Sequence, residues 1–225
     1  MSGTGIVVLL EPVEGIDVER RVPDTPKSRR TRARILDCTL ELFANEGYAA
    51  ASNARIAEAA GLTRGAMLYH FPDRESLLDA AVTHIQAIRA RLFEEAGRDA
   101  PHGDARTDHA IDAYWRLLSE PAFMAFAELE AAARTDRLVA SRVAVAQEDF
   151  DRAQVGEGMF DLVQGAPGPR FQASRDLARF LLEGLPRAHL TYDDEVRTER
   201  LLAVVKRAAR SLNRRGAAID LWPEG

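Results

Sequence analysis

The residue types in this sequence that could do chemistry are concentrated in one short block near the N-terminus. Five basic residues, Lys27, Arg29, Arg30, Arg32 and Arg34, fall within eight positions that contain no acidic residue. A helix start ordinarily favours acids because of the helix dipole, so this cluster indicates a surface that meets phosphate groups. The whole chain has a net charge of -5, whereas residues 27–78 carry eight basic and six acidic side chains and are net basic.

Residues that commonly carry catalysis or bind metals are sparse and scattered. The five histidines, at positions 70, 84, 102, 109 and 189, lack the i, i+3 or i, i+4 spacing of a metal site. The single cysteine, Cys38, has apolar neighbours and is expected to pack in a core, with redox sensing as the alternative. The sequence also has no Gly-rich phosphate loop, and we expect no enzymatic activity, no cofactor and no catalytic or metal-binding residues.

Length and composition indicate an ordinary globular protein of the cytoplasm. With 225 residues, 46% hydrophobic and 29% charged, the chain has room for one or two domains. The apolar stretch 5–10 is too short to span a bilayer, and residues 1–19 lack the basic leader of a signal peptide, so no membrane contact is expected. Residues 1–26, interrupted by Pro12, Pro23 and Pro26, are predicted to be a flexible tail or a packed arm.

Three helices are predicted in the basic block. Apolar residues recur at helical spacing over 31–46. Ser52 or Asn53 supplies an N-cap for a short second helix, Gly61 permits a tight turn, and Thr63 caps a third helix that runs to about residue 71. Two short helices joined by such a turn form a helix-turn-helix, the unit whose second helix enters a major groove of DNA.

The remainder of the chain is also predicted to be helical. Asp73 caps a long amphipathic helix to about Glu95. Later helices are expected at about 105–119, 121–133, 136–163, 172–188 and 193–214. Because no alternating strand pattern occurs, the prediction is an all-α fold, with a three-helix domain over 27–78 and a helical domain over 79–225.

The second and third helices carry a recognisable sequence signature. The run IAEAAGLTRGAMLYHF over residues 56–71, followed by DRESLL over 73–78, resembles the DNA-binding signature of the TetR/AcrR transcriptional regulators. The resemblance covers roughly residues 30–95. It implies an N-terminal DNA-binding domain and a C-terminal helical bundle that binds a ligand and dimerises.

The start of the third helix has the residues expected at a phosphate contact. Gly65 leaves the helix N-terminus bare, so that backbone N–H groups and the helix dipole can approach a phosphate. Thr63 and Arg64 add side-chain donors, and Arg64 could also read a guanine edge. Ser52 or Asn53 could bind phosphate as well as cap a helix.

The resemblance adds three contacts and one departure. Tyr69, His70 and Arg74 are expected to touch the sugar-phosphate backbone, although Tyr69 and His70 could instead be packed side chains. Leu68 stands where the family usually has a tyrosine. A leucine cannot donate to phosphate but could touch a thymine methyl, so Leu68 is included among the DNA-contacting residues.

Large apolar side chains are dense in the first helices of the C-terminal domain. An apolar, aromatic-lined ligand site is predicted from Trp115, Leu118, Phe123, Phe126 and Met159, while ordinary bundle core is the alternative for each.

The last two helices resemble the family's dimer interface. We therefore expect a homodimeric repressor that binds pseudo-palindromic double-stranded operator DNA and is released by a small apolar or aromatic molecule. An enzyme built on a helical bundle and a DNA-binding protein without a ligand are the alternatives.

Overall fold

The computed structural model describes residues 25–102, 104–155, 168–189 and 194–213, and every regular element in these ranges is a helix. The all-helical prediction is confirmed. The helices are α1 (Pro26–Glu46), α2 (Asn53–Ala59), α3 (Arg64–His70), α4 (Arg74–Gly97), α5 (Asp104–Leu117), α6 (Pro121–Ala133), α7 (Arg137–Val155), α9 (Pro169–His189) and α10 (Glu195–Asn213). None of these helices is long and apolar enough to cross a membrane.

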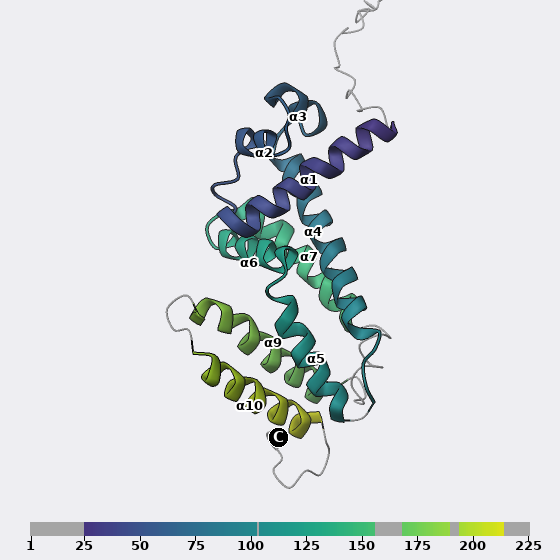
Figure 1. Ribbon diagram of the computed structural model, residues 1–225, viewed down its shortest axis with the longest axis vertical. Helices are drawn as coiled ribbons and strands as arrows, with labels where there is room; N and C mark the ends of the chain where they lie inside the picture. Colours follow the sequence, from purple (N-terminus) through teal and green to yellow (C-terminus); the bar gives the residue numbers. More distant parts are fainter. Residues whose placement is uncertain (1–24, 103, 156–167, 190–193, 214–225) are drawn as a thin grey trace, which may run out of the picture.

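The molecule is elongated, with its helices arranged from one end to the other (Figure 1). Helices α1, α2 and α3 form one end, which we call the head. Helices α5, α9 and α10 lie at the opposite end, while α6 and α7 lie between. Helix α4 runs from the head along α7 toward the far end and so connects the two ends physically.

Helix α1 begins earlier than the apolar periodicity predicted. It starts at Pro26 instead of Thr31, with Thr25 as N-cap and a hydrogen bond of 3.1 Å from the Ser28 backbone N–H to the Thr25 hydroxyl. The expectation that Pro26 interrupts regular structure is wrong, because a proline in the first turn loses no intrahelical hydrogen bond. The basic cluster of residues 27–34 is therefore part of the first turns of α1.

The caps of the next three helices follow the sequence prediction. Ser52 rather than Asn53 caps α2, and Thr63 caps α3. Asp73 caps α4 in a reciprocal arrangement with Ser76. Gly61, in the turn between α2 and α3, has a φ of +63°, a conformation that favours glycine. The helix-turn-helix is thus set by local chemistry.

The head does not have a core of its own. Buried residues of α1, α2, α3 and α4 form one continuous cluster with buried residues of α6 and α7, such as Phe126 and Val139. Helix α4 also passes without a break through residue 78, where the two domains were expected to meet. A second cluster, around Ile111, Leu182 and Val205, joins α5, α9 and α10.

Candidate functional site

The exposed surface of α3 contains three of the residues expected to touch DNA, Arg64, Gly65 and Tyr69. Met67 is fully buried and anchors the helix, while Arg64 and Gly65 are exposed at its first turn. A Cβ atom added at Gly65 would meet nothing within 4 Å, so the backbone there is open to an approaching ligand. Tyr69, one turn later on the same face, is 52% exposed.

Two of the expected phosphate contacts are occupied by capping. The hydroxyl of Ser52 accepts from the backbone N–H of Arg55 at 3.2 Å, and that of Thr63 accepts from Ala66 at 3.1 Å. Both caps are exposed, and each hydroxyl keeps its own proton for donation to an outside acceptor. Asn53 is half-buried, and its Oδ1 is buried without a hydrogen-bond partner among the described residues.

His70 lies in the packed position that the sequence left open as the alternative to DNA contact. Its side chain is 8% exposed, and its ring packs edge-on against Tyr69 with 5.3 Å between centroids. Burial, with a smaller contribution from Arg32, lowers the pKa of the imidazole, so the ring is neutral at pH 7. His70 is therefore better placed to stabilise the end of α3 than to touch a DNA duplex. Leu68, another residue of this helix expected to touch DNA, is half-buried.

Arg32 and Arg74 link α3 and the start of α4 to neighbouring elements. The Arg32 guanidinium donates to the backbone oxygen of His70 at 3.0 Å and lies 4.2 Å from the centre of the Phe71 ring. Arg74 donates from Nε to the Tyr48 hydroxyl at 3.1 Å and stacks on the same ring at 4.5 Å. Both arginines are exposed and held in one orientation, a property suited to positioning a phosphate contact.

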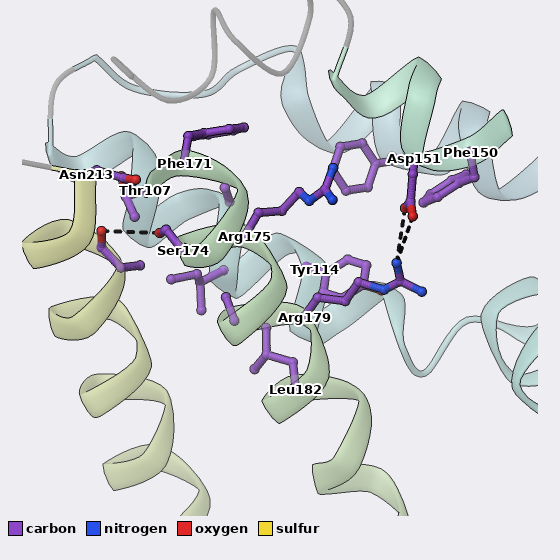
Figure 2. Close-up of a pocket in the computed structure, with 15 residues that line it drawn as sticks. Thr107, Tyr114, Phe150, Asp151, Phe171, Ser174, Arg175, Arg179, Leu182 and Asn213 are labelled. Atoms are coloured by element: carbon purple, nitrogen blue, oxygen red, sulfur yellow. Dashed lines mark hydrogen bonds and ion pairs between the residues drawn. The ribbon is translucent and has the colours of Figure 1, made fainter. Parts of the chain in front are cut away.

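A second candidate site lies at the other end of the molecule. It is a cavity of about 100 Å³ between α5 and α9, with contributions from α4, α7 and α10. Most of its wall is apolar and aromatic. Polar side chains lie at one end, with Thr107, Ser174 and Asn213, and at the opposite end, with Asp151 and Arg179 (Figure 2). The residues that line it are Phe93, Thr107, Ala110, Ile111, Tyr114, Phe150, Asp151, Phe171, Ser174, Arg175, Ala178, Arg179, Leu182, Ala209 and Asn213.

The four described residues predicted to bind the ligand lie around this cavity and do not line it. Trp115 and Leu118 pack against the α5, α9 and α10 cluster. Phe123 lies behind Tyr114 and Phe150, with ring centroids 6.1 and 6.4 Å away, and Phe126 is buried in the head cluster. Met159 lies outside the described residues. The sequence thus predicted the aromatic character of the wall but not the residues that form it.

A chain of polar contacts runs along one side of the cavity. Arg179 donates from Nη1 to both oxygens of Asp151 at 3.1 Å (Figure 2). It also donates from Nε to Glu183 at 2.8 Å. The hydroxyl of Tyr114 donates to the same Glu183 oxygen at 2.7 Å. Burial, reinforced by the Glu183 carboxylate, raises the pKa of Tyr114, so its phenol stays protonated as a donor.

This chain continues to α4 through a buried arginine. Gln147 donates to Asp151 at 2.8 Å and accepts from Arg89 at 3.5 Å. Arg89, only 3% exposed, also donates to Gln86 at 2.6 Å and lies over the rings of Phe126 and Phe150, 3.9 and 4.3 Å from their centres. Burial lowers the pKa of Arg89 to about 10.

The aromatic cage around Arg89 takes the place of a paired carboxylate, since cation–π contacts stabilise a desolvated guanidinium. The contacts therefore connect the cavity wall to the helix that enters the head.

The arginines of α9 were missed in the sequence, although a signal was present. Arg175 and Arg179 are one turn apart on a helix face that otherwise carries Phe171, Ala178 and Leu182. Charged residues that interrupt an apolar stripe at helical spacing are candidates for lining a buried site. In the part of the chain that the structure describes, no group of His, Cys, Asp and Glu side chains is arranged to hold a metal ion.

The head matches known proteins in sequence. The family model for bacterial regulatory proteins of the tetR family matches residues 35–81. The HTH-type transcriptional regulator AcrR of Shigella flexneri is 45% identical over 51 residues, which are 23% of this chain and 24% of AcrR. The HTH-type transcriptional repressor AcnR of Corynebacterium glutamicum is 37% identical over 71 residues, 32% of this chain and 38% of AcnR. These matches thus span well under half the length of either relative.

The fold as a whole matches solved structures. The crystal structure of a TetR family transcription regulator from Marinobacter aquaeolei aligns with a TM-score of 0.56 over 84% of this chain and 98% of that chain, at 17% identity. The similarity therefore extends through the C-terminal helices in fold, while sequence similarity is concentrated in the head.

Proposed function

We infer that this chain, which belongs to the tetR family of bacterial regulatory proteins through its N-terminal domain, is a DNA-binding transcriptional repressor of the cytoplasm that responds to a small molecule. The observation that carries the proposal is the exposed face of α3, within the residues that match the family model. Arg64, the bare backbone at Gly65 and the exposed Tyr69 together offer donors without competing acids on that helix.

The protein is proposed to act as a homodimer through α9 and α10. These two helices pack on each other at the end away from the head (Figure 1). They expose large apolar side chains, which are Leu177, Phe180, Val196 and Val204. Gly184, one turn after Phe180, has open space around its Cβ position and would let a partner helix approach closely. A two-fold dimer would direct two α3 helices to half-sites about 34–36 Å apart on a pseudo-palindromic operator.

The cavity between α5 and α9 is the proposed effector site. Its wall is continuous with the contacts that lead through Asp151 and Gln147 to Arg89 on α4. A ligand that moves Asp151 or Arg179 would disturb the contacts of Arg89 and so shift α4, which begins next to α3. Coupling of roughly 1–3 kcal/mol is typical of such a switch and corresponds to a 5- to 150-fold change in operator affinity.

The test is selection of duplexes from a random pool, followed by fluorescence anisotropy with the selected duplex. We expect a pseudo-palindromic site, and Arg64→Ala should weaken its binding about tenfold or more because a charged donor to DNA is lost. The control is Arg98→Ala, an exposed arginine at the other end of α4, which should bind as the unmodified protein does. Enrichment of no sequence, or unchanged affinity of Arg64→Ala, would contradict the proposal.

A further inference from the structure

Among the described residues, the cavity wall offers a guanidinium nitrogen without a hydrogen-bond partner, Nη1 of Arg175, while its acid groups are already engaged. Asp151 accepts from Arg179 through both oxygens and from Gln147, and Glu183 behind it accepts from Arg179 and Tyr114. We propose that the effector is a small monocarboxylate with an apolar body, whose carboxylate binds the guanidinium of Arg175. This inference rests on the proposed function, since it takes this cavity to be the effector site.

Arg175 is the donor available to such a ligand. It extends from α9 in the same direction as Arg179, toward the end of the cavity that Asp151 and Phe150 form (Figure 2). Its Nε and Nη2 both donate to one oxygen of the adjacent Asp176, at 3.0 and 2.8 Å. Its Nη1 has no hydrogen-bond partner among the described residues, in contrast to Nη1 of Arg179, which is bound to Asp151.

The contact with Asp176 does not neutralise Arg175 strongly. The Asp176 side chain is 39% exposed and that of Arg175 is 21% exposed, and ion pairs with this much solvent contact contribute little. A ligand carboxylate inside the cavity would be better shielded from water and could accept two parallel N–H bonds from the guanidinium. It would therefore compete well with Asp176.

The charges of the wall disfavour other ligand classes. A cation would face the guanidinium groups of Arg175 and Arg179 without an unengaged carboxylate to bind it. A fully apolar molecule would remove water from Arg175 and offer no acceptor in return, which is costly. A carboxylate supplies the acceptors that the guanidinium of Arg175 needs, while Phe93, Tyr114 and Phe171 would contact the hydrocarbon body.

The size of the cavity limits that body. Its volume of about 100 Å³ is below the roughly 150 Å³ of an engineered cavity that binds benzene. Acids with about four to six carbons are therefore expected to fit best, and an aromatic acid is expected to need some widening of the cavity.

The experiment is isothermal titration calorimetry of the full chain with isovalerate and hexanoate, each compared with its amide and its amine. The acids should bind at least tenfold more tightly than the amides, and the amines should bind no better than the amides. Arg175→Gln should lower acid affinity about tenfold or more, because a charge-assisted contact is lost, and should leave amide affinity unchanged. Arg116→Gln, on the exposed side of α5, is the matched control and should bind acids normally.

The comparison within the unmodified protein decides the question even if the variant folds poorly. Acids that bind no better than their amides or amines, or an Arg175→Gln variant with full acid affinity, would overturn the carboxylate assignment. Operator binding, measured on the same preparations, separates the two proposals. A chain that binds its selected duplex but no acid would disprove only this inference, whereas a chain that binds no duplex specifically would disprove the proposed function.

Discussion

Removal of the Phe180 ring should dissociate the proposed dimer. Phe180 is 65% exposed on α9, and since a phenylalanine buries about 150–250 Å², on the order of 130 Å² is open to a partner. At about 25 cal/mol per Å², this area is worth about 3 kcal/mol in each protomer and about 6 kcal/mol in a two-fold dimer. Only part of the free energy calculated from buried area appears as binding free energy, because association also costs translational, rotational and side-chain entropy.

We therefore expect Phe180→Ala to weaken dimerisation at least about a hundredfold, which corresponds to about 3 kcal/mol. Sedimentation velocity over a range of protein concentrations would measure the dissociation constant, and circular dichroism would verify that the helices are intact. Val145→Ala is the matched control, because Val145 is 59% exposed on α7, away from α9 and α10. A dimer of unchanged affinity in Phe180→Ala, or an unmodified chain that stays monomeric, would refute this interface.

Three further results are expected. Because burial lowers the pKa of His70, the folded state resists protonation of this ring, and the free energy of unfolding should fall as the pH drops below about 6.5. Urea titrations at pH 7.5 and 5.5 would measure this fall, which should be smaller in the His70→Asn variant. Phe126→Ala should lower the unfolding free energy by about 3–5 kcal/mol, since the ring is fully buried, and a loss below 1 kcal/mol would place it outside the core. In a Trp222→Phe background, hexanoate should change the fluorescence of Trp115, which packs on residues that line the cavity, whereas a flat signal at saturation would separate Trp115 from the effector site.

Local features of the fold could be predicted from the sequence because they depend on a few adjacent residues. Ser52, Thr63 and Asp73 each accept a hydrogen bond from a backbone N–H at the start of a helix. Short polar side chains of this kind are preferred just before a helix begins, so the sequence predicts these caps. The turn at Gly61 has the same origin. For this reason the sequence alone predicts the helix-turn-helix and, with it, the exposed residues of α3.

The cavity could not be located in this way, because it depends on contacts between distant segments. The density of aromatic residues in this part of the sequence predicted that Phe123 and Phe126 line the ligand site. Both rings are instead buried in the hydrophobic core, where large side chains fill space. Arg89 would be placed on a solvated helix face by its type alone. Its burial arises because α6 and α7 bring the rings of Phe126 and Phe150 over it from elsewhere in the chain.

The continuous core of the head and the middle helices limits how this protein could be recombined with others of similar fold. A hybrid protein that combined residues 1–78 with the C-terminal part of another protein would remove the contacts between α1 and α6. Side chains that are buried between these helices would then lose their packing partners. The C-cap of α1 also lies beside α6, since a Cβ at Gly47 would lie 3.1 Å from the Glu128 carboxylate. Exchange of DNA specificity is therefore better made by grafting the outer surface of α3 than by exchanging the whole head. A graft of that kind would keep every buried contact through which an effector could act on the operator.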